Sequence, residues 1–286
     1  MQNDRVLFSI FLAAVIFTGV LILYPAYHAL VLSFQNVSSF ISEAEWVAFA
    51  NYVKVLKMSE FWEALGHGMV FSITAITLQI VFGICFAILL DLYFPGKAFV
   101  RAIAVLPYLL PTIIVALTFQ WMLDTSYGVF TLAGQFLGLD YIPWGENGAV
   151  AMGLVIFLSV WIWTPFVTLA CLAGIQSIPT QLHEAAKVDG ASGWQRFWHI
   201  TIPQLRPVLM VVLLLRAIWM FNKFDIIWLT TKGGPMGATE HLPILAYRQT
   251  FELYEVGTGA TISAISFFIL SAFILVFFYF FPLEEK

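Results

Sequence analysis

Charged residues are scarce in this chain. Only 10% of its 286 residues are Asp, Glu, Lys or Arg, whereas a soluble domain carries about a quarter. The net charge of −4 is small and no long basic run occurs, which excludes the basic surface that binding to nucleic acid requires. Hydrophobic residues make up 61% and aromatic residues 17%. Most of the surface is therefore expected to face lipid rather than water.

Cysteine pairs and nucleotide-binding loops are also lacking. Cys85 and Cys171 lie in separate apolar runs, so the sequence offers neither a disulfide framework nor the spacing of a metal site. The pattern GxxxxGK[ST] does not occur, so no loop of this kind cradles the phosphates of ATP. No nucleophile is paired with a base in the apolar runs, which argues against an enzyme embedded in the membrane.

Long apolar runs are the main feature that the sequence does contain. A helix that crosses a membrane needs about 20 mostly apolar residues. Six runs satisfy this, at residues 6–32, 67–90, 100–123, 149–173, 208–230 and 260–281. Because barrel strands are short and alternating, these continuous runs predict an all-α integral membrane protein with six transmembrane helices in a single domain, 1–286. The first run is too long for a signal-peptide core and is expected to be retained.

The placement of lysine and arginine predicts which side of the membrane each loop occupies, because these residues favour cytoplasmic loops. With the N-terminus inside, seven of the 13 basic residues lie on the inner side and four on the outer side. The inner set is Arg5, Lys97, Arg101, Lys187, Arg196, Arg206 and Lys286, and the outer set is Lys54, Lys57, Lys232 and Arg248. Both termini are therefore predicted to be cytoplasmic. The outer loop 124–149 agrees, since it holds Asp124, Asp140 and Glu146 and no basic residue.

The loop between the fourth and fifth runs, residues 175–207, contains signals for a first short helix. Residues 181–188 are mostly good helix formers, and Thr180 is placed to cap them. Gly190 follows two residues later and supplies the left-handed residue that ends a helix. The pattern predicts a helix and a tight glycine turn on the cytoplasmic surface.

A second short helix is expected after the turn. Ser192 and Gln195 have the spacing of a capping box. Three aromatic residues give this helix an apolar side: Trp194, Phe197 and Trp198. Pro203 and Pro207 then mark the beginning of the fifth run, where proline is tolerated in a first turn. The loop is therefore expected to be a rigid helical hairpin that can transmit force to a partner.

The run Glu184-Ala185-Ala186-Lys187-Val188-Asp189-Gly190-Ala191, followed by Ile202-Pro203, resembles the EAA loop of binding-protein-dependent ABC import permeases. The longer stretch is similar to the carbohydrate branch of that family, although the family usually has Leu where this chain has Ile202. Residues 101–111 and 224–235 also resemble family segments. The resemblance implies the type I importer permease fold, in which this loop is a coupling helix pair that docks in a groove of an ATPase subunit. It implies that coupling residues are Glu184, Ala185, Ala186, Asp189, Gly190 and Ala191.

The same resemblance implies what the chain does and what it binds. The expected function is ATP-driven import of a sugar or sugar derivative across the bacterial inner membrane. The implied partners are a homologous second permease, two ATPase subunits and an extracytoplasmic solute-binding protein, with the lipid bilayer around them. ATP and Mg²⁺ would be bound by the ATPase subunits, and this chain would hold no cofactor and no metal. A self-contained secondary carrier or channel is the alternative, and it would transport without ATP.

The fifth apolar run carries polar side chains that are costly at membrane depth, about 3 kcal/mol per charge on insertion scales. At 100° per residue they share one half of a helix with a tryptophan. The substrate-path candidates are Arg216, Trp219, Asn222, Lys223 and Asp225, with Trp163 of the fourth run. Two interpretations stay open: these groups stack on and bond a sugar, or they pair internally or with the second permease. The local positive charge suggests an acidic sugar, although Asp225 can neutralise it.

Overall fold

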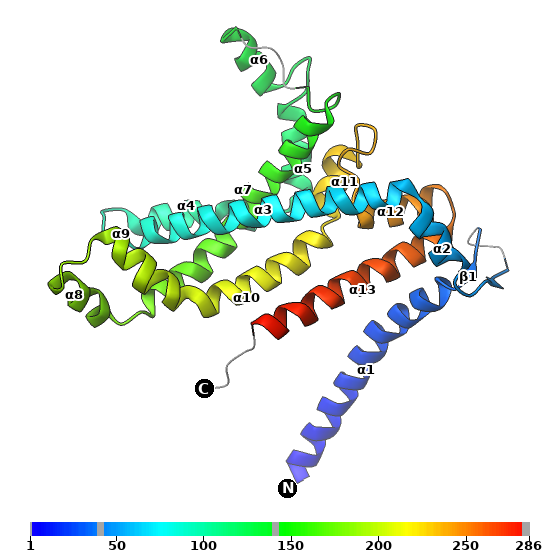
Figure 1. The fold of residues 1–286 in the computed structure, drawn as a ribbon, viewed down its shortest axis with the longest axis horizontal. Coiled ribbons are helices and arrows are strands. Elements are labelled where there is room, and N and C mark those ends of the chain that lie inside the picture. The colour runs from blue at the N-terminus through cyan, green and yellow to red at the C-terminus, as the bar shows by residue number, and fades with distance from the viewer. Residues whose placement is uncertain (1, 39–42, 139–142, 282–286) are drawn as a thin grey trace. The chain divides into compact units, whose positions relative to one another are not determined.

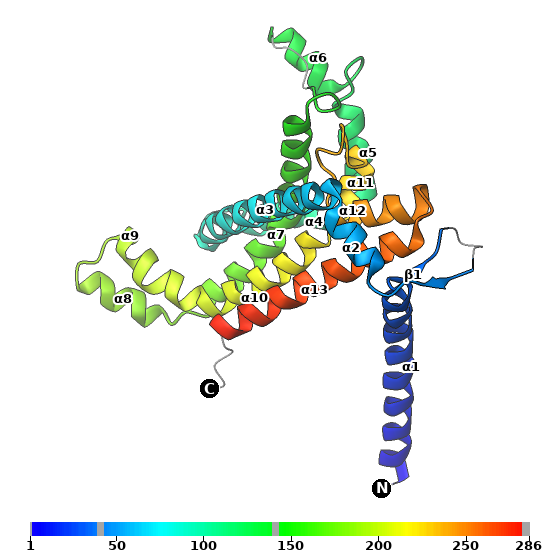
Figure 2. The ribbon, with the colours of Figure 1, turned by 45° about the vertical axis from the view of Figure 1, so that its right-hand side comes forward.

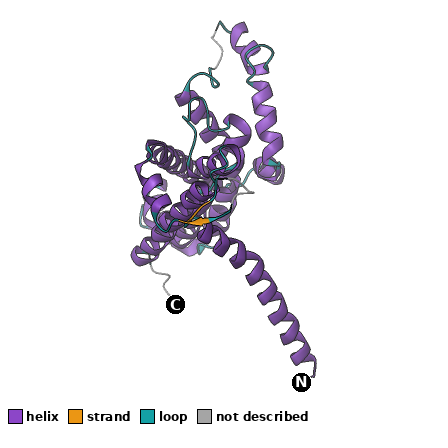
Figure 3. Cartoon of the chain, turned by 90° about the vertical axis from the view of Figure 1, so that its right-hand side faces the viewer, coloured by secondary structure: helices purple, strands orange, loops and turns teal. Residues whose placement is uncertain are grey.

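The computed structural model describes residues 2–38, 43–138 and 143–281. Asp140 and Lys286, which entered the orientation argument, lie outside these residues, as does the side chain of Arg5. Helices dominate the described chain (Figure 3), and its strands are limited to β1 (Gln35–Asn36) and β2 (Glu45–Trp46). The two strands form an antiparallel pair that the sequence did not predict. The chain divides into two units, which are described separately.

The first unit comprises residues Met1–Glu63 and Leu242–Ile269. Its elements are α1 (Gln2–Leu32), β1, β2, α2 (Ala50–Lys57), the start of α3 (Ser59–Asp91), α12 (Leu242–Tyr247), the π-helix η2 (Arg248–Glu252) and most of α13 (Val256–Phe280). The buried Asn51 donates from Nδ2 to the carbonyl oxygens of Ser33 and Gln35, at 3.1 and 2.9 Å. Thr261 donates to the same Ser33 oxygen at 3.0 Å. These bonds join the end of α1 to α2 and α13.

The second unit comprises residues Ala64–His241 and Leu270–Lys286 and contains both candidate sites. Besides the remainder of α3 and the end of α13, its elements are α4 (Lys97–Leu109), α5 (Thr112–Met122), α6 (Val129–Phe136), α7 (Gly148–Gln176), α8 (Thr180–Val188), α9 (Gly193–Arg196), the π-helix η1 (Phe197–Thr201), α10 (Ile202–Phe221) and α11 (Asp225–Thr231) (Figure 1).

Five helices of the described chain are long and apolar enough to cross a membrane, or six if the bent pair α4–α5 is counted as one span. The apolar run predicted a continuous helix at 100–123, but α4 and α5 meet at 91°. Pro111 accounts for the break, because a residue that precedes proline is pushed out of the helical region. Leu110 accordingly has the extended angles φ −78° and ψ 135°.

The helix expected at 208–230 is also interrupted. Helix α10 ends at Phe221 and α11 begins at Asp225, so three residues of irregular backbone, 222–224, separate them. Irregular backbone at membrane depth is tolerated only where it is buried in protein or lines a cavity. This break is therefore a natural place for a polar site.

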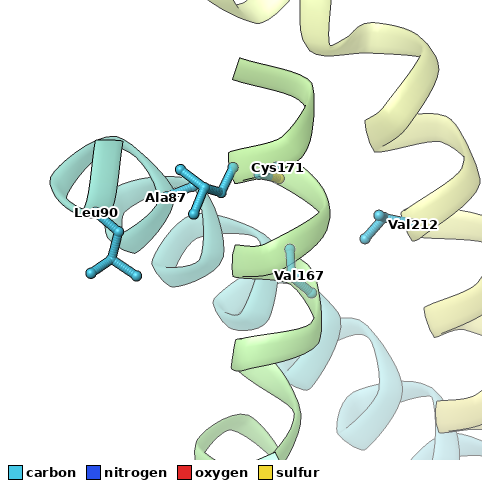
Figure 4. Packing of buried hydrophobic residues seen from close by; sticks show 6 residues of the cluster. Ala87, Leu90, Val167, Cys171 and Val212 are labelled. Atoms are coloured by element: carbon cyan, nitrogen blue, oxygen red, sulfur yellow. The ribbon is translucent and has the colours of Figure 1, made fainter. Parts of the chain in front are cut away.

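The core of the second unit lies where α3, α7 and α10 meet. The buried cluster consists of Ala87, Leu90, Val167, Cys171, Leu172 and Val212 (Figure 4). Small residues bring the helices close, as is usual for helix pairs in membranes. A Cβ on Gly83 would lie 2.5 Å from a methyl of Val167, and one on Gly174 would lie 2.6 Å from a methyl of Leu205. Close packing at these glycines holds the helices that carry the polar residues discussed next.

Candidate functional site

The turn around Gly190 ends α8 with a complete Schellman motif. The Ala191 amide donates to the Ala186 carbonyl at 2.8 Å, and the Gly190 amide donates to the Lys187 carbonyl at 3.1 Å. Gly190 has φ +79°, the left-handed conformation that this motif requires. Asp189 forms the C-cap of α8. Gly190 therefore makes the turn that the sequence predicted.

Local capping agrees with the sequence at one helix start and differs at the other. Ser192 accepts from the Gln195 amide, and the Gln195 side chain accepts from the Ser192 amide, so the predicted capping box is confirmed. Thr180 was expected to cap the first helix. It is instead the first residue of α8, Pro179 occupies the N-cap position, and no side chain caps that helix. The prediction for Thr180 was wrong because proline at position 179 already sets the extended backbone that precedes a helix.

The α8–α9 hairpin presents most of the predicted coupling residues to solvent. Glu184, Ala185, Asp189 and Gly190 are exposed, whereas Ala186 and Ala191 are half-buried. The Glu184 side chain makes no hydrogen bond or ion pair with any described residue. The hairpin also exposes large apolar side chains, since Val188 is 88% and Trp194 is 69% exposed. An exposed apolar surface with an unpaired acid beside it is typical of a docking surface.

The second arm of the hairpin is continuous with a membrane span. Helices α9, η1 and α10 form one run of 29 residues, Gly193–Phe221, and the hairpin sits at its end (Figure 2). The sequence predicted a short helix separate from the fifth run, with Pro203 and Pro207 marking where that run begins. The structure instead inserts the π-turn η1 directly before α10, whose second residue is Pro203, and a widened turn accommodates a residue that cannot donate to the preceding turn. The hairpin and α10 therefore share one uninterrupted helical run.

The polar cluster at the far end of α10 centres on the Trp163 ring from α7. The Lys223 ammonium lies 3.6 Å from the centroid of this ring, and the Arg216 guanidinium carbon lies 5.7 Å from it. Both distances are within the range of cation–π attraction. Lys223 also forms an ion pair with Asp225 at 2.8 Å. Four of the six predicted path residues are therefore brought together at the break between α10 and α11.

Trp219 and Asn222 complete the predicted set in different ways. Trp219 is 42% exposed, packs edge-on against Phe166, and lies 5.6 Å from the Arg216 guanidinium carbon. Asn222 is exposed, and its side chain donates only to the Ile218 carbonyl of its own helix at 3.2 Å. Trp219 thus joins the cluster. The Asn222 side chain bonds only its own helix, so no contact with the cluster fixes its orientation.

Arg216 is buried inside the second unit, with an exposed fraction of 1%. Its Nε donates to Oε1 of Gln79 on α3 at 2.8 Å, and its Nη2 lies 3.5 Å from the sulfur of Met220. Gln79 in turn donates to the Ser159 carbonyl at 3.1 Å. No carboxylate pairs with Arg216 in the described parts of the chain. This geometry favours the structural interpretation of Arg216 over direct contact with a substrate.

Sequence reasoning did not assign Gln79 to this cluster. A glutamine in an apolar run usually bonds a neighbouring helix, and nothing local identifies its partner, which lies 137 residues away. Phe166 was also missed, since an aromatic residue in a membrane span carries no signal of its contact. The available hint was the charge of Arg216, which needs an acceptor somewhere in the bundle.

Comparison with known proteins agrees with this architecture. The sequence pattern of the family described as "Binding-protein-dependent transport system inner membrane component" matches residues 79–281. The trehalose/maltose transport system permease protein MalF of Thermococcus litoralis is 38% identical over 90% of this chain and 87% of its own length. The sulfoquinovosyl glycerol transport system permease protein SmoG of Agrobacterium fabrum is 31% identical over 93% of this chain and 87% of its own.

A solved structure shares the fold. One chain in the crystal structure of a bacterial ABC transporter, involved in the import of the acidic polysaccharide alginate, superposes with a TM-score of 0.84. It covers 98% of this chain and 96% of that chain at 22% sequence identity. The predicted all-α importer permease fold is thereby confirmed.

Proposed function

This chain belongs to the family of binding-protein-dependent transport system inner membrane components, and we propose that it is the membrane-spanning subunit of an ATP-driven sugar importer. The relatives named above transport trehalose or maltose and sulfoquinovosyl glycerol, which supports a sugar or sugar derivative as substrate. The complex would contain a homologous second permease, two ATPase subunits and an extracytoplasmic solute-binding protein. ATP and Mg²⁺ would be bound by the ATPase subunits, and this chain contributes no catalytic residue to hydrolysis.

The observation that carries the proposal is the continuity of the hairpin with α10. Between Gly193 and Arg216 the helix rises about 35 Å at 1.5 Å per residue. ATP-driven closure of the ATPase pair would move the docked hairpin, and the continuous helix would carry that movement to the Trp163 cluster. Such a scheme requires a coupling free energy between the two ends. Glu184, Ala185, Ala186, Asp189, Gly190 and Ala191 are the proposed coupling residues.

The Trp163 cluster is the proposed substrate path. Aromatic rings stack on the faces of sugars, and the Trp219 ring is exposed enough to do so. Asp225 and Asn222 could bond sugar hydroxyls, because both side chains are accessible. Arg216 would not touch the sugar itself but would fix the positions of the Trp163 and Trp219 rings.

An acidic sugar is the finer hypothesis for the substrate. Two cations, Arg216 and Lys223, lie at the Trp163 ring, and one carboxylate, Asp225, pairs with Lys223, so the cluster carries excess positive charge. The alginate importer that shares the fold handles an acidic polysaccharide, and the SmoG relative transports a sulfonated sugar derivative by its name. Lys223→Met should then weaken uptake of a uronate more than uptake of a neutral disaccharide such as trehalose.

The location follows from the same argument. The chain is proposed to lie in the bacterial inner membrane as a multi-pass protein. The hairpin and both termini are placed in the cytoplasm, where ATPase subunits would reach the hairpin. The window of α1 that is apolar enough to cross a membrane has no buried residues within the chain, as expected for a helix facing lipid or the second permease.

The deciding experiment compares Glu184→Lys with Glu63→Lys, an equal charge change at an exposed residue outside the hairpin. The complex is purified through a tag on this chain and placed in liposomes with its binding protein. Glu184→Lys should reduce both ATPase recovery and ATP-dependent uptake, and Glu63→Lys should leave both near wild type. A self-contained carrier would instead transport without ATP and would be indifferent to Glu184→Lys, and that result would remove the proposal.

A further inference from the structure

A cavity with both apolar and polar lining residues lies apart from the Trp163 cluster, where α5 packs beside α11 (Figure 1). Its volume is about 280 Å³, near the lower end of the range of about 300–1,000 Å³ for small-molecule sites. This volume suits one sugar ring rather than a whole oligosaccharide. The residues that matter for the argument are Gln120, Trp144, Gly145, Thr231 and Lys232.

The cavity lies at the opposite end of α7 from the coupling hairpin. Trp144 and Gly145 come directly before α7, which begins at Gly148, whereas the hairpin follows its last residue, Gln176. A helix of 29 residues separates its two ends by about 43 Å. If the hairpin is cytoplasmic, as proposed above, the cavity opens toward the extracytoplasmic side.

Hydrogen bonds fix the walls of the cavity. The Trp144 indole donates to the Leu123 carbonyl at 2.9 Å, which holds its ring in place. Gln120 donates to the Thr230 carbonyl at 2.6 Å. Thr231 and Thr239 share a hydrogen bond at 2.7 Å, and Thr239 also donates to the Gly234 carbonyl at 2.9 Å. Fixed walls lower the ordering cost of binding a ligand.

The lining offers the two kinds of contact that a carbohydrate uses, an aromatic face and a few polar side chains. A held indole offers a flat apolar face. The Thr231 hydroxyl already donates to the Ile227 carbonyl and Gln120 Nε2 to the Thr230 carbonyl, so their oxygens are acceptors for sugar hydroxyls. Lys232 is exposed and its ammonium makes no ion pair with any described residue, so it is available to a hydroxyl or an acidic substituent.

Helix α11 connects this cavity to the proposed substrate path. Its first residue, Asp225, belongs to the Trp163 cluster, and its C-cap, Lys232, lines the cavity. The seven residues of the helix span about 10 Å. A sugar in the cavity would therefore be one short helix away from the Trp163 cluster.

We propose that this cavity is an outer saccharide-binding site, which holds one sugar ring of the substrate on Trp144 before the sugar reaches the Trp163 cluster. The inference rests on the proposed function for the identity of the ligand as a sugar. It adds a separate site, made by residues that the coupling loop and the Trp163 cluster do not include.

The test is ¹⁹F NMR of the purified complex with 5-fluorotryptophan in this chain. Signals are assigned by the single variants Trp144→Phe, Trp163→Phe and Trp121→Phe. The probes are maltose, trehalose and an alginate disaccharide, added without binding protein or ATP. The Trp144 signal should shift with at least one probe. The Trp121 signal should stay in place, because Trp121 is an exposed residue of α5 outside the cavity.

A Trp144 signal that moves with none of the three probes overturns the inference. The Trp163 signal and ATP-dependent uptake report on the proposed function separately, so the two ideas can fail independently. Gly145→Phe provides a second check, because Gly145 lines the cavity and an added Cβ there meets no atom within 4 Å. This variant should fold and should abolish the shift of the Trp144 signal. A shift that persists in Gly145→Phe would place the sugar elsewhere and would also overturn the inference.

Discussion

Arg216 donates from Nε to Oε1 of Gln79 at 2.8 Å, and this bond joins α10 to α3 inside the helix bundle. The guanidinium is 1% exposed and Gln79 is fully buried. A charge in this position depends on the acceptor that the neighbouring helix supplies. The pair therefore fixes the axial position of α10 relative to α3 near the Trp163 cluster.

Removal of Gln79 should destabilise the chain through the charge that it leaves behind. Gln79→Leu is expected to cost about 2 kcal/mol, the scale for losing a hydrogen bond to a charged group. The double variant with Arg216→Met should recover much of this loss, because both polar groups are then gone. Thermal unfolding of the detergent-purified complex measures the effect, with Gln135→Leu on the exposed face of α6 as control. Strictly additive losses in the double variant would contradict the pairing.

The turn at Gly190 should not tolerate a side chain. Gly190→Ala places a Cβ at φ +79°, which costs about 1–2 kcal/mol for an L-residue. Gly193→Ala, three residues along, is the matched control. It lies in α9, and its Cβ would meet only the end of the Arg196 side chain at 3.9 Å. Gly190→Ala should lower sugar-stimulated ATPase activity and Gly193→Ala should not, and equal effects of the two would refute a special role of this turn.

The first turn of α13 packs against β1 too closely for any side chain at Gly257. A Cβ there would lie 2.1 Å from the carbonyl oxygen of Gln35. Gly257→Ala is therefore expected to destabilise the chain by about 1–3 kcal/mol, as overpacking does. Gly66→Ala serves as control, because its Cβ would meet nothing within 4 Å and alanine favours helix. Melting temperatures that fall equally for both variants would contradict the contact.

Acid should destabilise the chain through His241. Burial lowers the pKa of His241 from 6.5 to about 4, and its ring lies 6.2 Å from Phe71 with an exposed fraction of 1%. The unfolded chain binds this proton near pH 6.5 and the native chain only near pH 4. Stability should therefore be unaffected above pH 7 and fall by about 3 kcal/mol between pH 6.5 and pH 4.

His241→Phe should remove this part of the acid sensitivity, since the ring that replaces it cannot bind a proton. The measurement is the melting temperature of wild type and variant at several pH values between about 4 and 7.5, a range that covers the pKa of His241 in the folded and unfolded chain. The difference in melting temperature between wild type and variant should be constant near neutral pH and should change as the pH falls below 6.5. Parallel curves across the whole range would show that another group carries the acid response.

Much of the fold and part of the site could be predicted because the signals are local. Continuous apolar runs predict membrane helices, and the Ser192–Gln195 spacing predicts the capping box that the structure contains. The bend at Leu110–Pro111 was missed although Pro111 is a local signal. The run was identified by its length and hydropathy, and neither property shows that a proline breaks the helix. The continuity of α9 with α10 was missed for the opposite reason, since Pro203 indicated a boundary and the π-turn η1 removed it.

The sequence by itself determined that this is a helical membrane protein with a capped hairpin turned by Gly190, because hydropathy, capping and glycine conformation depend on neighbouring residues. Only the tertiary structure decided that Arg216 bonds Gln79, that Lys223 sits over Trp163, and that Trp144 and Lys232 line one cavity. The members of each pair lie far apart in the chain. Whether they contact each other depends on the axial shift and rotation of the packed helices. That setting is fixed by many small contacts, such as those at Gly83 and Gly174, and no single residue encodes it.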